Sequence, residues 1–304
     1  MSMYTRLTRP RRSVAAIIAI ALLCLPADAA AAPKQAPLQQ MRALWVDQSN
    51  PGFHNPAEVD ELVANAVAAN MNTLFVQVRR HGDAMYNAGP EPRAVVPGLA
   101  PAAWFDPLAM LLQKAHAAEL RVHAWLVISV ACRNSDPLRG NPQHLCTQHG
   151  PSAPDPARWT TVTYNDTQVG DLDFGHPQAV IYMESVVQNL LHNYPALDGI
   201  HYDYVRYADQ EYGYNAISLA RFNAAYARPQ NTRPTPTDPQ WSQWRRDRIT
   251  ELVRRLYIRI KAINPKIQVS AATITWGGVG SYSPTDWPHS AAYNRVFQDW
   301  KAWL

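Results

Sequence analysis

The stretch "DGIHYDYVRY", residues 198–207, decides how the fold is assigned. Its Gly-Ile start and its aromatic and β-branched residues are typical of a strand, and a helical segment precedes it. Buried strands of a parallel sheet are usually near-continuous runs of Val, Ile and Leu. This one also carries His201, Asp203 and Arg206. These polar residues indicate either a structural network or the floor of an active site.

Strand and helix patterns alternate along the rest of the chain. The predicted strands are residues 42–47, 72–79, 121–129, 198–207 and 266–275. The predicted helices are residues 55–70, 106–120, 176–194, 215–227, 239–263 and 293–304. The first two helices open on Asn-Pro and Asp-Pro, which supply an N-cap and a proline suited to the first turn. A long polar loop is expected between the third strand and about Asp171.

Repeated strand–helix units favour a parallel sheet with crossover helices. No GxGxxG follows the first strand, which argues against a dinucleotide-binding fold. We therefore predict an α/β fold of the (β/α)₈ TIM-barrel type, whose functional residues lie at the C-terminal ends of the strands. Such a barrel usually takes about 250 residues or more. Only five strands are predicted before Leu304, so we expect a barrel truncated after its fifth strand and following helix; an open sheet is the alternative.

The N-terminal residues have the pattern of an export signal. Four arginines lie within residues 6–12, an apolar run spans 14–25, and the small-residue stretch "PADAAAAP" follows. This order predicts a signal peptide, residues 1–32, that is removed from a periplasmic or secreted protein. The apolar run is shorter than the roughly 20 residues that a spanning helix needs, so no stable membrane span is expected.

The net charge argues against a nucleic-acid partner. The whole chain has a formal net charge of +4, but residues 1–32 hold four arginines and one aspartate, so the remainder carries about +1. The arginine-rich segment 245–259 also contains Asp247 and Glu251. We interpret it as the solvated outer face of a helix rather than a polyanion site.

After signal removal the chain would keep two cysteines, Cys132 and Cys146. In an exported protein this pair predicts a disulfide, and two free thiols are the alternative. Neither cysteine has the CxxC or His-rich spacing of a metal site. We expect no metal and no other cofactor.

Polar and aromatic residues gather toward the ends of the predicted strands. Residues two apart in a strand share a face, so Gln77 should point with Arg79, and His201 with Asp203. Burying such groups costs several kcal/mol unless each is paired, which favours a functional cleft or, alternatively, a structural salt-bridge layer. The candidates for substrate binding are Asp47, Gln77, Arg79, His123, Trp125, His201, Tyr204 and Arg206.

Asp203 is the predicted catalytic residue. A carboxylate at a strand end, between two tyrosines, fits a nucleophile or a group that stabilises an oxocarbenium-like transition state. The alternative is that Asp203 only pairs with Arg79 or Arg206. Asp47 could likewise cap a loop, and His123 and Trp125 could be core residues. A second carboxylate could be Asp47, Asp83 or a residue beyond Leu304.

Five motifs carry a resemblance to a known family. They are "RALWVD" (42–47), "NTLFVQVRRHGDAMY" (72–86), "VHAWL" (122–126), "DLDFGHPQA" (171–179) and "LDGIHYDYVRY" (197–207). Together and in this order they resemble the glycosyl hydrolase-like 10 family. The resemblance implies that residues 41–304 form a (β/α)₈ barrel domain whose C-terminal part is missing, because the family's chain continues into a sixth strand with an "IPMNY"-like motif.

The same resemblance implies an exported glycosidase that acts on peptidoglycan glycan strands stripped of their peptides. Asp203 matches the carboxylate of the fourth-strand motif. Asp47, Arg79, His123, Trp125 and His201 match polar or aromatic positions around the cleft. Chitinase-type catalysis is disfavoured, because His201 and Val205 stand where the DxxDxDxE pattern has acidic residues.

The leading hypothesis is a hydrolase that cleaves O-glycosidic bonds in peptidoglycan glycan strands, or in a related amino-sugar polysaccharide, by carboxylate acid/base catalysis. A non-catalytic barrel that binds cell-wall glycan is the alternative from another class. An inactive truncated product is the third.

Overall fold

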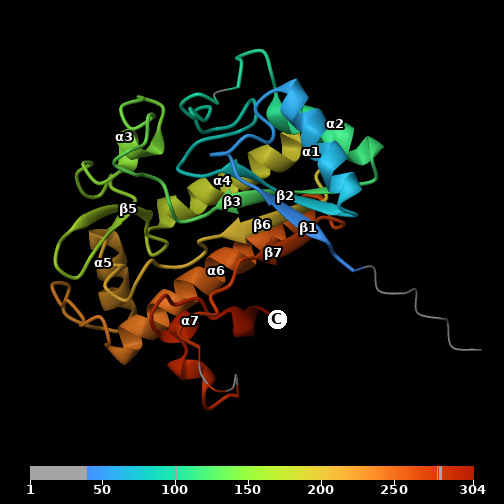
Figure 1. The fold of residues 1–304 in the computed structure, drawn as a ribbon. Helices are drawn as coiled ribbons and strands as arrows, with labels where there is room; N and C mark the ends of the chain where they lie inside the picture. Colours follow the sequence, from blue (N-terminus) through green and yellow to red (C-terminus); the bar gives the residue numbers. More distant parts are fainter. Residues whose placement is uncertain (1–39, 100, 279, 281–282) are drawn as a thin grey trace, which may run out of the picture. The chain divides into compact units, whose positions relative to one another are not determined.

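Five parallel strands form the central sheet (Figure 1), in the order β1-β2-β3-β6-β7. The computed structural model describes residues 40–304 apart from 100, 279 and 281–282, so the predicted signal peptide lies outside the described residues. The strands are β1 Ala43–Val46, β2 Thr73–Arg79, β3 Arg121–Val127, β6 Gly199–Asp203 and β7 Gln268–Ala271. Each lies within a predicted strand. The prediction of a parallel α/β sheet is therefore confirmed.

Helices connect the strands and pack on one another beside the sheet. The helices are α1 Pro56–Ala68, α2 Pro107–Ala117, α4 Pro177–Asn193, α5 Ala216–Ala225 and α6 Pro239–Ile263. The side chains of Asn55 and Asp106 accept hydrogen bonds from backbone N–H groups in the first turns of α1 and α2, as the Asn-Pro and Asp-Pro pairs predict. Helix α1 packs on α2, and α4 packs on α6.

Alternation along the strands separates two kinds of side chain. One set is apolar and joins the main core with residues of α2, α4 and α6. It includes Leu74, Val76, Val122, Leu126 and Ile200, all without exposed surface. Burial of such side chains stabilises the fold by about 1.5–3 kcal/mol each. The other set carries the aromatic and polar residues of the predicted site.

The segment expected as a long polar loop contains regular structure. It holds the short helix α3 Leu145–His149 and an antiparallel pair, β4 Thr160–Val162 with β5 Gln168–Leu172. A further bridge joins Val130 to Asp171, so the hairpin is attached to the chain that leaves β3. Short strands with polar residues lack the apolar alternation by which a strand is recognised.

The predicted helix at residues 293–304 is wrong. The chain instead forms α7 Ala291–Asn294 and, later, a 3₁₀ turn at Trp300–Trp303. Phe297 has a φ of +57°, which interrupts the helix. The buried Gln298 side chain accepts from Ile274 N (2.7 Å) and donates to Ala272 O (3.1 Å). These bonds satisfy backbone groups beyond β7, and a continuous helix would not supply them.

The arginine-rich helix α6 also differs in part from the prediction. Arg254 and Arg259 are exposed, as expected. Arg245 is fully buried and Arg246 nearly so. The Arg245 guanidinium donates to backbone carbonyls, among them Tyr212 O at 2.8 Å, and lies 3.8 Å from the centre of the Phe297 ring. It joins α6 to neighbouring loops.

A β-bulge moves Arg79 off the face that Gln77 occupies. The register between β2 and β3 shifts between Gln77 and Arg79, so the expectation that the two share a face is wrong. Arg79 is fully buried and forms an ion pair with Glu91 at 2.8 Å. Its guanidinium also donates to the Val127 and Val130 carbonyls. Tyr182 of α4 donates to Glu91 at 2.7 Å, so the pair joins two strands to a helix.

The Arg79–Glu91 pair should contribute strongly to stability. Replacing Arg79 with Met leaves the buried Glu91 without its countercharge, and we expect the free energy of unfolding to fall by roughly 3–5 kcal/mol. Denaturant unfolding measures this change. The exposed pair of Arg254 with Glu251 provides the control, since Arg254→Met should change stability by less than about 1 kcal/mol. Equal effects of the two variants would contradict the assignment.

Candidate functional site at the strand ends

Aromatic rings cover the face of the sheet opposite the main core. The Trp45 ring centre lies 5.0 Å from that of Phe75, 4.8 Å from Trp125 and 4.7 Å from His201. Phe75 also contacts His123 at 5.2 Å. Trp45 is half exposed, while both histidines are buried. The predicted residues His123, Trp125 and His201 therefore lie together, with Trp45 and Phe75 as neighbours that the sequence reasoning missed.

The two histidines are held in their neutral form. Burial lowers the pKa of His123 to about 4 and that of His201 to about 4. His201 Nδ1 lies 2.8 Å from the Ser270 hydroxyl, whereas neither ring nitrogen of His123 has a hydrogen-bond partner among the described residues. Gly199 makes room for this ring, because a Cβ there would lie 2.4 Å from His123 Nδ1.

Asp203 stands at the C-terminal end of β6, next to this aromatic surface. Its two oxygens accept from Trp125 Nε1 at 3.0 Å and from Tyr204 N at 2.8 Å. Burial raises the pKa of Asp203 above its usual range, and this outweighs the two hydrogen bonds and the nearby charge of Arg206. Among the described residues, neither Arg79 nor Arg206 forms an ion pair with it. The alternative that Asp203 only pairs with one of these arginines therefore does not hold.

Tyr204 and Arg206 follow the strand rather than lie in it. β6 ends at Asp203, and Tyr204 has a φ of +49°, a conformation that turns the chain. Tyr204 is 39% exposed, and the Arg206 guanidinium lies 4.5 Å from the centre of its ring. An exposed ring beside a carboxylate can stack on the apolar face of a sugar.

Asp47 and Gln77 mainly organise the neighbouring loops. Asp47 accepts from the backbone of Ser49 at 2.7 Å and from the Asn50 side chain at 2.9 Å, as the loop-cap alternative expects. Gln77 is buried and accepts from Gln48 N at 3.2 Å. Arg79, paired with Glu91, offers no accessible group to a substrate. Its role is to position strands β2 and β3.

Asp171, on β5, is a second carboxylate that the sequence reasoning did not select. Burial raises its pKa above the usual range, against the opposing charges of Arg133 and Arg206. Arg206 thus interacts electrostatically with both Asp171 and Asp203. The motif "DLDFGHPQA" contains the sequence feature that could have identified Asp171, because it places two acidic residues in an apolar context. The second acid, Asp173, is fully buried and accepts from the Ser218 hydroxyl at 2.8 Å, which makes it a structural residue.

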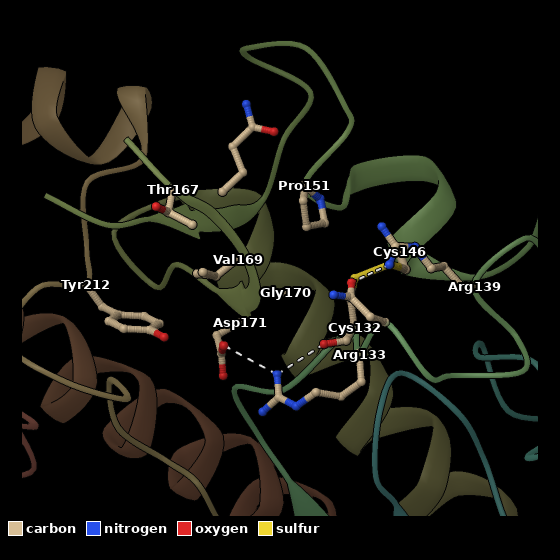
Figure 2. Close-up of a pocket in the computed structure, with 12 residues that line it drawn as sticks. Cys132, Arg133, Arg139, Cys146, Pro151, Thr167, Val169, Gly170, Asp171 and Tyr212 are labelled. Atoms are coloured by element: carbon tan, nitrogen blue, oxygen red, sulfur yellow. Dashed lines mark hydrogen bonds and ion pairs between the residues drawn. A yellow bond between two sulfur atoms is a disulfide. The ribbon is translucent and has the colours of Figure 1, made fainter. Parts of the chain in front are cut away.

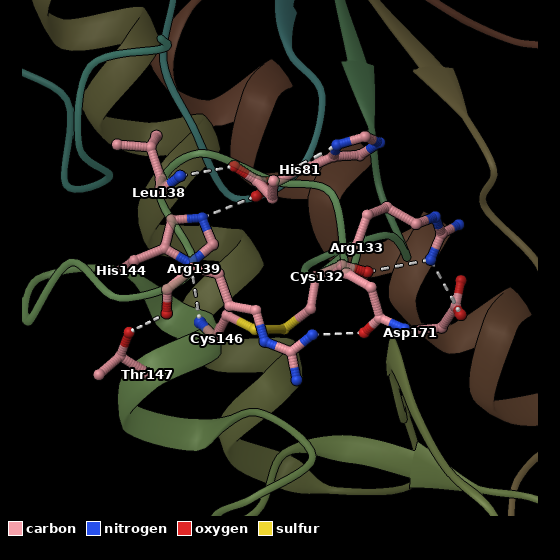
Figure 3. The surroundings of a disulfide bond; sticks show 11 residues. His81, Cys132, Arg133, Leu138, Arg139, His144, Cys146, Thr147 and Asp171 are labelled. Carbon is pink, nitrogen blue, oxygen red and sulfur yellow. Dashed lines mark hydrogen bonds and ion pairs between the residues drawn. A yellow bond between two sulfur atoms is a disulfide. The ribbon is translucent and has the colours of Figure 1, made fainter.

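A hollow of about 360 Å³ lies beside Asp171 (Figure 2). A disulfide between Cys132 and Cys146 forms part of its wall. Figure 3 shows the contacts around this disulfide: His144 Nδ1 accepts from Cys146 N at 3.0 Å, and Thr147 donates to Arg139 O at 2.7 Å. The short helix α3 is thereby fixed against the chain that leaves β3.

Within the part of the chain that the structure describes, three or more His, Cys, Asp or Glu side chains nowhere cluster in a way that could hold a metal ion. Within the same residues, every helix is too short or too polar to cross a membrane.

Comparison with known proteins identifies relatives over nearly all of this region. The profile of the glycosyl hydrolase-like 10 family matches residues 40–304. The glycosyl hydrolase DigH of Escherichia coli K12 is 25% identical over an alignment that covers 88% of this chain and 63% of the relative. The glycosyl hydrolase YngK of Bacillus subtilis is 23% identical over 88% of this chain and 52% of the relative. The chain thus spans less than two thirds of the length of these relatives.

Solved structures support the fold. An α-L-fucosidase of Paenibacillus thiaminolyticus superposes with a TM-score of 0.55 at 14% identity, covering 83% of this chain and 35% of that one. A β-galactosidase of Marinomonas ef1 gives 0.50 at 11% identity, covering 76% and 37%. The prediction of a TIM-barrel type fold is confirmed, and the sheet of five parallel strands is consistent with a partial barrel.

The buried histidines predict acid sensitivity. Between about pH 6.5 and 4, an unfolded chain protonates His123 and His201 while the folded chain does not. The unfolded state then binds more protons, so the free energy of unfolding should fall as the pH falls through this range. His123→Phe should reduce this slope by up to about 1.4 kcal/mol per pH unit. Urea unfolding at several pH values measures it.

His192→Gln serves as the control, because His192 is exposed in the last turn of α4. This variant should keep the slope of the unmodified protein. An unchanged slope in His123→Phe would show that the folded and unfolded chains protonate this imidazole equally, which would contradict the lowered pKa.

Proposed function

The chain belongs to the glycosyl hydrolase-like 10 family, and on this premise we propose that it is an exported glycosidase that cleaves peptidoglycan glycan strands or a related amino-sugar polysaccharide. Membership supports a glycosidase-like function, and DigH and YngK are named as glycosyl hydrolases. The export pattern at residues 1–32 and the disulfide both suit an oxidising compartment outside the cytoplasm.

The environment of Asp203 is the observation that carries the proposal. A half-buried carboxyl group with a raised pKa keeps its proton more readily than an ordinary aspartate. A glycosidase needs such a group to protonate the leaving oxygen. The Trp125 indole fixes the carboxyl orientation, and Trp45 and Tyr204 offer exposed rings nearby for sugar stacking.

Glycosidases pair the acid with a second carboxylate, which activates water or attacks the sugar. Asp171 is the candidate that the described residues favour. Both oxygens of Asp47 are engaged by Asn50, and both oxygens of Asp83 accept hydrogen bonds, from Arg80 N and from Gln48. Among the described residues, the Asp171 side chain accepts one hydrogen bond, from Arg133 at 3.5 Å, and so keeps acceptor capacity for water or substrate.

Glycan-strand hydrolysis by the Asp203→Asn variant tests the proposal. Removing an acid–base group usually costs 10²–10⁴-fold in rate, so turnover of peptide-free glycan strands should fall at least about 100-fold. Release of soluble fragments, followed by chromatography, measures turnover. Asp60→Asn is the matched control, because Asp60 is an exposed carboxylate on α1 paired with Lys114, and its turnover should be unchanged.

The same assay separates the enzyme from the glycan-binding alternative. A non-catalytic binding protein would show no cleavage with either version, and Asp203→Asn would keep its glycan affinity. Cleavage that survives in Asp203→Asn at the original rate would refute the catalytic assignment.

A further inference from the structure

The hollow beside the disulfide, lined by Cys132, Arg133, Arg139, Cys146 and Asp171, has no role in the proposed acid–base step beyond Asp171 itself. We call it the disulfide hollow. Its volume of about 360 Å³ suits one sugar ring with its substituents (Figure 2). Two of the residues that line it, Arg133 and Arg139, carry positively charged guanidinium groups.

Arg139 is an exposed cation without a countercharge. Among the described residues it forms no ion pair, and its one side-chain hydrogen bond runs from Nη1 to Asn134 Oδ1. Its Nε and Nη2 donors are therefore left for another acceptor. A guanidinium edge of this kind binds a carboxylate through two parallel hydrogen bonds.

Arg133 is only partly satisfied. In the described structure its Nη1 alone is used, by Cys132 O at 3.1 Å and by Asp171 at 3.5 Å. Two arginines thus stand against one aspartate whose burial already disfavours its charge. The surplus of positive charge favours an anionic group in the hollow.

The disulfide fixes both sides of this site. Cys132 directly precedes Arg133. Cys146 lies in the first turn of α3, next to Thr147, whose hydroxyl donates to Arg139 O at 2.7 Å. Holding donors in place before binding lowers the entropic cost of association. Arg206 interacts electrostatically both with Asp171, which lines the hollow, and with Asp203.

We propose that the disulfide hollow is a subsite for a sugar carboxylate, held by Arg139 with support from Arg133. In a peptide-free peptidoglycan strand the group is the lactyl carboxylate of the muramic acid residue. The inference rests on the proposed function, since it names the substrate feature that the site recognises.

Binding by the full chain carrying Asp203→Asn tests this without cleavage. Three probes are compared by calorimetry: peptide-free glycan fragments, the same fragments with their carboxylates converted to methylamides, and hyaluronan fragments, in which the carboxylate belongs to a uronic acid. We expect the amidated fragments to bind about tenfold more weakly or worse, the usual scale for a charge-assisted hydrogen bond. Hyaluronan binding as tight as that of the glycan fragments would support sugar-carboxylate recognition but overturn the preference for the lactyl group.

Adding Arg139→Gln to the Asp203→Asn chain tests whether Arg139 is the residue that binds the carboxylate. Affinity for the free-acid fragments should drop about tenfold, and affinity for the amidated fragments should stay the same. Arg254→Gln, an exposed arginine of α6, is the matched control and should change neither. Thermal unfolding of each variant confirms that the fold is kept.

Equal affinity for the free-acid and amidated fragments would overturn the subsite and leave the proposed function standing. Absence of binding to every glycan probe, together with absence of cleavage by the unmodified chain, would overturn both. A drop in affinity for the amidated fragments on Arg139→Gln would show that Arg139 acts on the loop rather than on a carboxylate.

Discussion

Side-chain alternation along five parallel strands is the constraint on which the rest of the structure depends. One set of side chains must be apolar because α2, α4 and α6 cover it. The other set carries different chemistry. Trp45 lies against His201, Phe75 contacts both His201 and His123, and Asp203 is joined to this surface by its hydrogen bond from Trp125. A single extra residue in β2 breaks the alternation, which is why Arg79 leaves this surface and pairs with Glu91 instead.

Much of this was predictable from local patterns. The five strands and the helices opened by Asn-Pro and Asp-Pro depend on short-range signals, and they occur where expected. The displacement of Arg79 could not be predicted, because a bulge depends on how two strands pair. The region from 293 to 304 has helical periodicity, but the backbone beyond β7 needs the Gln298 side chain, and this long-range contact outweighs local preference.

The sequence predicted several residues of the candidate site correctly, but it did not predict the role of each one. His201, Trp125 and Asp203 do lie together, since period-two spacing determines which residues share a face. Asp47 and Gln77, by contrast, accept hydrogen bonds from the backbone of the loop after β1. Burial sets the ionisation of the others: it keeps two imidazoles neutral and favours the protonated form of Asp203. Asp171 was not predicted as a site residue because β5 and its partner β4 are short and lack the apolar alternation by which a strand is recognised.

The close approach of Gly199 to the His123 ring couples two positions that lie far apart in the chain. No side chain fits at 199 while the imidazole occupies that space. The constraint acts in one direction: position 123 can become small while glycine stays at 199, but a larger residue at 199 becomes acceptable only after that change. Relatives that keep an aromatic or imidazole ring at 123 in this orientation should therefore keep glycine at 199, and relatives with a larger residue at 199 should have a small residue at 123.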